Sequence, residues 1–236
     1  MNHAIIRHII GVVLKIEAVF MLPSVVVAFI YMEKKAMTAF AISIALCFTL
    51  GFLLSRNKPK NTLFFAKEGF VMVALSWIVM SIFGALPFVI SQDIPNFVDA
   101  LFETISGFTT TGASILTNVE DLNKSTIFWR SFTHWIGGMG VFVLILAILP
   151  MADSSLHILK AESPGPSVGK LVPKIRDTEK ILYMIYIVMT LIQIILLCIA
   201  RMPFFDALTI SFGTAGTGGF GIKNDSMASY STTIQL

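Results

Sequence analysis

Residues 106–114 read SGFTTTGAS, and residues 213–221 read GTAGTGGFG. Each stretch follows an apolar helical segment of only about ten residues, which is too short to cross a bilayer core that requires roughly 20. Sliding the chain by 107 positions places Phe97 on Phe204 and keeps the two Thr/Gly stretches in register without a gap. The sequence therefore predicts a repeated unit that consists of a span, a half-helix, a Thr/Gly loop and a second span.

The composition is that of a membrane protein. Of the 236 residues, 56% are hydrophobic and only 13% are charged, and the mean hydropathy is +0.82. A soluble domain carries about 25% charged residues, and a water-soluble fold of this length could not bury so much apolar surface. The net charge of +3 is small and dispersed, so nothing favours a nucleic-acid partner.

Five apolar runs are long enough to cross a bilayer as helices. They occupy residues 9–30, 36–54, 70–90, 127–150 and 181–200. The first run contains Lys15 and Glu17, so we expect it to lie partly at the membrane interface. The predicted organisation is two leading helices in residues 1–66, a first repeat in 67–150, a linker in 151–180 and a second repeat in 181–236.

The charges between the runs predict the orientation. Basic residues gather between the second and third runs and again in residues 151–180, whereas residues 91–126 are mainly acidic. Because cytoplasmic loops of membrane proteins carry the excess of Lys and Arg, the two basic segments are expected in the cytoplasm together with the N-terminus. The linker 151–180 is thus predicted to be cytoplasmic.

The second repeat is expected to lack its closing helix. In the first repeat that helix begins near Ile127, and the equivalent position in the second is Ile234, two residues before the last residue of the sequence. Repeat units bury their faces against neighbouring units. The sequence is therefore interpreted as the N-terminal portion of a longer protein.

The Thr/Gly loops have the composition of a cation filter. A half-helix that ends at membrane depth directs the partial negative charge of its C-terminus at the loop, and successive backbone carbonyls can replace the hydration shell of a cation. Glycine permits the backbone angles that such a loop requires, and threonine adds a hydroxyl oxygen. Two loops cannot close a fourfold ring, so two more would be needed. The candidate ion-binding residues are Thr110, Thr111, Gly112, Ala113, Thr217, Gly218, Gly219 and Phe220.

The two loops and residues 134–150, HWIGGMGVFVLILAILP, resemble the TrkH/KtrB family of potassium-uptake proteins. The similarity extends over essentially the whole chain, and the two leading helices point to the TrkH branch. The resemblance implies an all-α membrane protein with helix–pore-helix–helix repeats of a potassium-channel-like fold. It also implies four such repeats around one pore in the bacterial inner membrane, and uptake of potassium with no organic cofactor. The expected partners are membrane lipid, a second copy of the chain and a cytosolic nucleotide-binding regulatory subunit of the TrkA type.

By the same resemblance, Gly112 and Gly219 occupy the filter-glycine positions, and glycine at the first of them favours potassium over sodium. The family's later filters, its gating loop in the third repeat and a basic residue in its last helix have no counterpart in this sequence. The choice between channel-like and ion-coupled transport is left open.

Two other functions remain as alternatives. One is a polytopic membrane enzyme that uses His134, Arg130 and the outer carboxylates, although a role of His134 in helix packing is the more common one for such a residue. The other is a non-conducting structural fragment of a membrane complex. Gly216, Gly218 and Gly221 also satisfy GxGxxG, but a dinucleotide site requires a strand before that motif and a helix after it.

Further residues have both a structural and a functional interpretation. Gly137, Gly138 and Gly140 can kink their helix or allow close packing against a neighbour. Asp99 and Asp206, near the starts of the half-helices, suit the positive helix end and could also attract cations to an outer vestibule.

Overall fold

The computed structural model describes residues 2–57, 59, 66–148 and 175–235, with the side chains of 66–68, 141–148 and 175–179 left out. The described residues form helices and contain no strand. In chain order the helices are α1 (His3–Ile30), α2 (Lys34–Ser55), α3 (Ala66–Ser91), α4 (Phe97–Phe108), α5 (Lys124–Ile148), α7 (Ile175–Ile199), α8 (Phe204–Ala215) and α9 (Thr232–Gln235). Residues 151–174 of the predicted linker 151–180 lie outside the described residues, and its last residues begin α7.

Four helices are long and apolar enough to cross a membrane. They are His3–Ile30, Lys34–Ser55, Gly69–Ser91 and Lys180–Ile199, and they match four of the five predicted runs. The fourth predicted run falls in α5, which is not among the four. This helix is interrupted at Gly140, whose φ of 69° and ψ of 137° are non-helical, and residues 149 and 150 lie outside the described part of the chain. The expected kink is therefore confirmed at Gly140.

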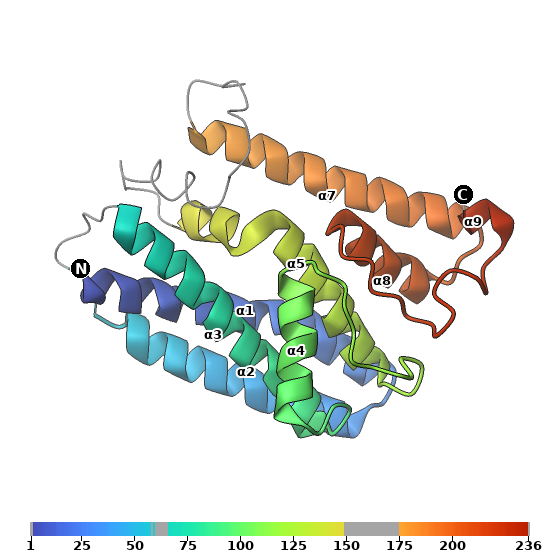
Figure 1. Ribbon diagram of the computed structural model, residues 1–236, viewed down its shortest axis with the longest axis horizontal. Coiled ribbons are helices and arrows are strands. Elements are labelled where there is room, and N and C mark those ends of the chain that lie inside the picture. The colour runs from blue at the N-terminus through green and yellow to red at the C-terminus, as the bar shows by residue number, and fades with distance from the viewer. Residues whose placement is uncertain (1, 58, 60–65, 149–174, 236) are drawn as a thin grey trace.

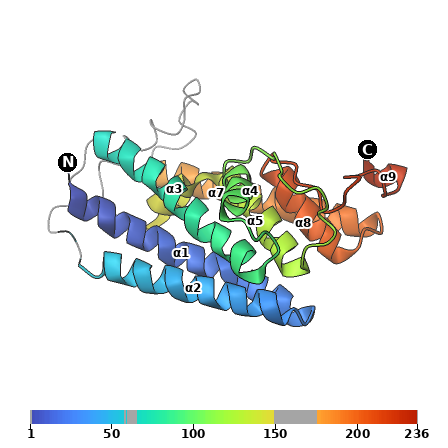
Figure 2. The ribbon, with the colours of Figure 1, turned by 60° about the horizontal axis from the view of Figure 1, so that its bottom comes forward.

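Helices α1, α2 and α3 lie side by side and form one half of the molecule (Figures 1 and 2). Close approach of α1 to α2 depends on two glycines, because a Cβ built on Gly11 would lie 2.7 Å from the Gly51 oxygen, and one on Gly51 equally close to the Gly11 oxygen. Small residues at such a contact let helix backbones meet in a membrane protein. Glu17, predicted to lie near the interface, is instead only 1% exposed inside this group.

The two short helices α4 and α8 occupy equivalent places in the two repeats. Helix α4 packs against α3 and α5, and α8 packs against α5 and α7. Each has 12 residues, and their first residues, Phe97 and Phe204, are separated by the predicted 107 positions. Helix α9 begins at Thr232, close to the position equivalent to the start of α5. The half-helices predicted from the sequence are thus present with the expected register.

Candidate functional site

The two Thr/Gly loops have the same backbone conformation. Thr110 and Thr217 have positive φ angles of 53° and 57°, and Gly112 and Gly219 have φ angles of 74° and 79°. Residues other than glycine seldom adopt a positive φ, and such strain gathers at functional sites. Both pairs are again 107 positions apart, so the register predicted from sequence identity also holds for the backbone.

The same turn ends each short helix and leads into its loop. The amide of Thr111 donates to the Ser106 carbonyl at 2.9 Å, and the amide of Gly218 donates to the Gly213 carbonyl at 2.9 Å. Because these bonds close the C-terminal ends of α4 and α8, the negative ends of both helix dipoles lie at the loops.

The first loop lies directly against the second. A Cβ built on Gly112 would overlap the carbonyl oxygen of Gly218. The close packing expected for the α5 glycines is also present, because Gly137 abuts the Phe108 carbonyl and a Cβ on Gly138 would lie 2.6 Å from the Cα of Gly216. Helix α5 therefore supports the start of both loops.

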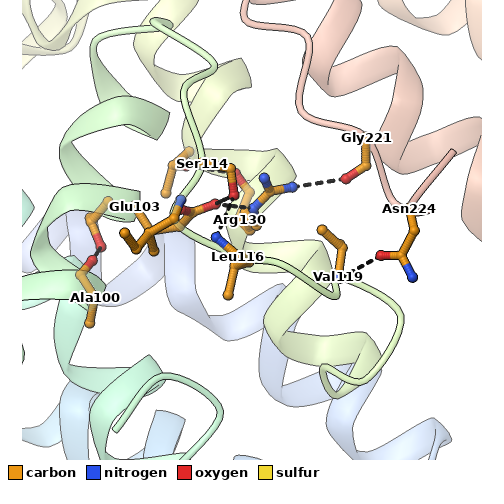
Figure 3. A network of polar contacts seen from close by, with 11 residues as sticks. Ala100, Glu103, Ser114, Leu116, Val119, Arg130, Gly221 and Asn224 are labelled. Carbon is orange, nitrogen blue, oxygen red and sulfur yellow. Dashed lines mark hydrogen bonds and ion pairs between the residues drawn. The ribbon is translucent and has the colours of Figure 1, made fainter. Parts of the chain in front are cut away.

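A buried ion pair joins the two loops (Figure 3). Glu103 on α4 accepts hydrogen bonds from the Ser114 hydroxyl at 2.9 Å and the Ile115 amide at 3.0 Å, both in the first loop. The same carboxylate contacts Arg130 Nε at 2.5 Å. Arg130 in turn donates from Nη1 to the Gly221 carbonyl of the second loop at 2.9 Å. Because both charged side chains are buried and hydrogen-bonded, this network fixes the loops relative to one another.

The ring of Phe220 is clamped behind the second loop. The Arg130 guanidinium lies 3.5 Å from the centroid of the Phe220 ring. The His134 imidazole stacks on the same ring, with 3.9 Å between the ring centroids and an interplanar angle of 15°. Phe220 is 3% exposed and His134 is fully buried. The side chain of Phe220 therefore anchors the loop, and only its backbone can face a ligand.

The other predicted ion-binding residues are exposed or half-exposed on the loops. They are Thr110, Thr111, Gly112, Ala113, Thr217, Gly218 and Gly219. The Thr111 hydroxyl pairs with the Thr109 hydroxyl at 2.7 Å. The structure thus brings the two predicted sets of residues together at one place.

The outer segments after the loops are also joined. The Val119 amide donates to the side chain of Asn224 at 2.9 Å, and the Asn224 side chain donates to Asn118 at 2.7 Å. The backbone amide of Asn224 donates to the Glu120 carboxylate at 3.0 Å. These bonds connect the first repeat to the second and add to the ion pair in holding the loops together.

Carboxylates line a hollow beside the first loop. Asp93, Asp99 and Asp121 face a cavity of about 460 Å³. Asp99 lies in the first turn of α4, as expected, and Asp206 takes the same place in α8. The Tyr230 hydroxyl donates to Asp206 at 2.7 Å. Burial raises the pKa of Tyr230, and the Asp206 hydrogen bond and charge raise it further.

The structure places the two residues named for the enzyme alternative behind the loops. Arg130 is engaged by Glu103 and Gly221, and His134 is covered by Phe220. The two residues proposed for catalysis are therefore part of the support behind the loops.

Sequence reasoning missed the roles of Glu103 and Glu33. Glu103 belongs to the acidic segment 91–126. A carboxylate in an apolar half-helix and an arginine in an apolar run are a recognisable signal for a buried pair. Glu33 accepts hydrogen bonds from the backbone amides of Lys124 and Ser125 at 2.6 and 3.0 Å, and so caps the start of α5. A capping contact over about ninety residues of sequence leaves no local pattern.

The long apolar helices are those of a multi-pass membrane protein. A family model described as "TrkH: Cation transport protein" matches residues 33–236, and the chain belongs to this family.

Individual relatives agree with the family. A Trk system potassium uptake protein TrkH from Vibrio parahaemolyticus is 36% identical over 228 residues, which are 95% of this chain and 47% of the relative. A Trk system potassium uptake protein TrkG from Escherichia coli is 32% identical over 98% of this chain and 48% of its own length. The crystal structure of the potassium transporter TrkH from Vibrio parahaemolyticus superposes with a TM-score of 0.81 at 34% identity, over 100% of this chain and 48% of that one. The chain thus spans about half the length of these relatives.

Proposed function

We propose that the chain contributes two of the four ion-coordinating loops of a potassium-uptake transporter in the bacterial inner membrane. The observation that carries the proposal is the pair of loops with matching left-handed residues in mutual contact. Residues 110–113 and 217–220 present backbone carbonyls, which can replace the hydration shell of potassium as it passes. Potassium is the transported ion, and its ligands are these carbonyl oxygens together with the threonine hydroxyls.

The surroundings of the loops suit a cation and a fixed pore. The C-terminal ends of α4 and α8 add partial negative charge, and the Asp99 carboxylate lines a hollow beside the first loop. Arg130 is neutralised by Glu103 and does not oppose a cation at the loops. The buried pair also links the first loop to the second and so limits their movement relative to one another.

The complete transporter has two further loops from residues outside this chain. In this proposal the chain enters the membrane from a cytoplasmic N-terminus, and potassium moves inward through the pore. Trk systems are named as potassium-uptake proteins among the relatives. The assembly includes a second copy of the chain and a cytosolic nucleotide-binding subunit of the TrkA type. Channel-like passage and ion-coupled symport both use the same loops.

The test is potassium uptake in a bacterium that lacks its own potassium transporters. Cells receive either residues 1–236 or the same chain extended by its natural downstream sequence, and growth and rubidium uptake are measured at low potassium. The extended chain restores growth, and residues 1–236 alone do not. Failure of the extended chain to move potassium or rubidium, while present in the membrane, would contradict the proposal.

A further inference from the structure

Glu17 is a carboxyl group that the proposed pore does not use. It lies midway along α1, a helix of 28 residues, and its residue is 1% exposed. Among the described residues, neither of its carboxyl oxygens has a hydrogen-bond partner. An ionised carboxylate in such a place is very costly, and a buried carboxyl without a partner therefore keeps its proton. Ionisable residues at membrane depth are also candidates for function.

The carboxyl lies behind the pore helix of the first repeat. A Cβ built on Gly84 of α3 would meet three groups at once: Phe108 Cε2 and Thr104 Cγ2, each at 2.9 Å, and Glu17 Oε1 at 3.2 Å. Phe108 is the last residue of α4 and leads directly into the Thr/Gly loop. Glu17 and the C-terminal end of α4 therefore both pack closely around Gly84.

Among the described side chains, the charged and titratable groups on the surrounding helices do not offer Glu17 a counter-ion. Helix α2 packs against α1 and carries the buried thiol of Cys47, and the described side chains of α3 from residue 69 to 91 carry no charge. Lys15 on α1 lies against Gly51 of α2. On α4 and α5, Glu103 and Arg130 are paired with each other. A negative charge on Glu17 would therefore remain uncompensated.

We propose that Glu17 is an intramembrane proton-binding site that holds α1 and α3 against the pore helix α4. With the proton bound, the neutral carboxyl packs beside Phe108 and Thr104, and the first loop keeps its position. When the proton leaves to the solvent, the carboxylate destabilises this packing point and displaces the end of α4. Transport therefore decreases as the pH rises and Glu17 loses its proton.

The protonation state is tested by infrared spectroscopy of the complete natural chain in lipid at neutral pH. The carbonyl stretch of a protonated carboxylic acid, identified by its shift in D₂O, is compared between wild type, Glu17→Gln and the control Glu33→Gln. Glu33 is a suitable control because its carboxylate accepts two amide hydrogen bonds and a hydroxyl hydrogen bond at the start of α5. The band is lost in Glu17→Gln and kept in Glu33→Gln. A spectrum of Glu17→Gln that retains the whole band overturns the proposal.

The functional consequence is tested by rubidium uptake into vesicles across pH. In the wild type, uptake falls by about tenfold per pH unit on the alkaline side of the titration, because the protonated fraction falls at that rate. Glu17→Gln keeps the neutral shape and loses this decline, so its uptake at neutral pH is unchanged and its alkaline profile is flat. A Glu17→Gln profile that declines in parallel with the wild type overturns the coupling to the pore.

The infrared and uptake measurements separate failure of the Glu17 proposal from failure of the proposed potassium function. The uptake measurement rests on the proposed potassium function, whereas the infrared band reports on Glu17 whether or not the chain transports potassium. If Glu17→Gln does not fold, Glu17→Met replaces it in both measurements, since it has a similar length and no titratable group. Loss of the band in Glu17→Met supports the proposal, and its retention overturns it.

Discussion

Contact between the two loops can be measured with a matched pair of glycine substitutions. Gly112 and Gly219 have nearly the same backbone, with φ angles of 74° and 79°. A Cβ on Gly112 would overlap the Gly218 oxygen. A Cβ on Gly219 would have no atom of the described residues within 4 Å, apart from those of its two chain neighbours. Gly112→Ala and Gly219→Ala therefore share the strain of a positive φ and differ in the overlap.

The expected magnitudes follow from these two contributions. A positive φ costs a residue with a Cβ roughly 1–2 kcal/mol, which is the whole effect expected for Gly219→Ala. Overlap with a backbone oxygen that cannot move aside adds about 1–3 kcal/mol for Gly112→Ala. The effect on the unfolded chain is common to both variants and cancels in the difference.

The assay is unfolding of purified residues 1–236 in one detergent, followed by circular dichroism. We expect the free energy of unfolding of Gly112→Ala to lie below that of Gly219→Ala by about 1–3 kcal/mol. Equal destabilisation of the two variants would refute the reasoning, because it would mean that the loops do not touch at Gly112.

Three further predictions concern other contacts. Glu103→Gln leaves the Arg130 guanidinium buried without a counter-ion and is expected to lower the free energy of unfolding by about 3–5 kcal/mol, which denaturant titration measures; a loss below about 1 kcal/mol would argue against a buried pair. Gly51→Ala places a methyl group 2.7 Å from the Gly11 oxygen, and it should cost about 1–3 kcal/mol in the same titration; an unchanged midpoint would contradict close contact of α1 and α2. The pKa of Tyr230 is raised in the folded protein. The protonated hydroxyl therefore contributes its full stabilisation below the ordinary pKa of tyrosine, and this stabilisation is lost as the pH rises through the raised pKa. Tyr230→Phe should remove part of the decline in melting temperature at strongly alkaline pH, and an identical decline in both proteins would refute this.

Much of the fold was predictable because the membrane imposes simple rules. Four of the five apolar runs correspond to helices of spanning length, and the short apolar segments end where the Thr/Gly residues begin. The internal repeat carried the rest, since an offset found from identical residues also relates the positive φ angles of Thr110 and Thr217. Local composition and register therefore fixed the expected position of the loops.

The support behind the loops was harder to predict. Arg130 and Glu103 are 27 positions apart and meet only because α4 packs against α5. Glu17 was expected to draw the first run toward the interface, but tertiary packing buries it beside Gly84. The neighbours of these side chains depend on how the helices pack against one another. The spacing of residues along the sequence does not predict that packing.

The central claim is that the two Thr/Gly loops coordinate the transported ion, and locating that ion tests it most directly. Crystals of the complete natural chain grown in rubidium, a heavier congener of potassium, would reveal the ion by its anomalous scattering. The account predicts anomalous peaks beside the carbonyls of residues 110–113 and 217–220. Rubidium bound elsewhere in the membrane-spanning part, with these carbonyls unoccupied, would contradict it.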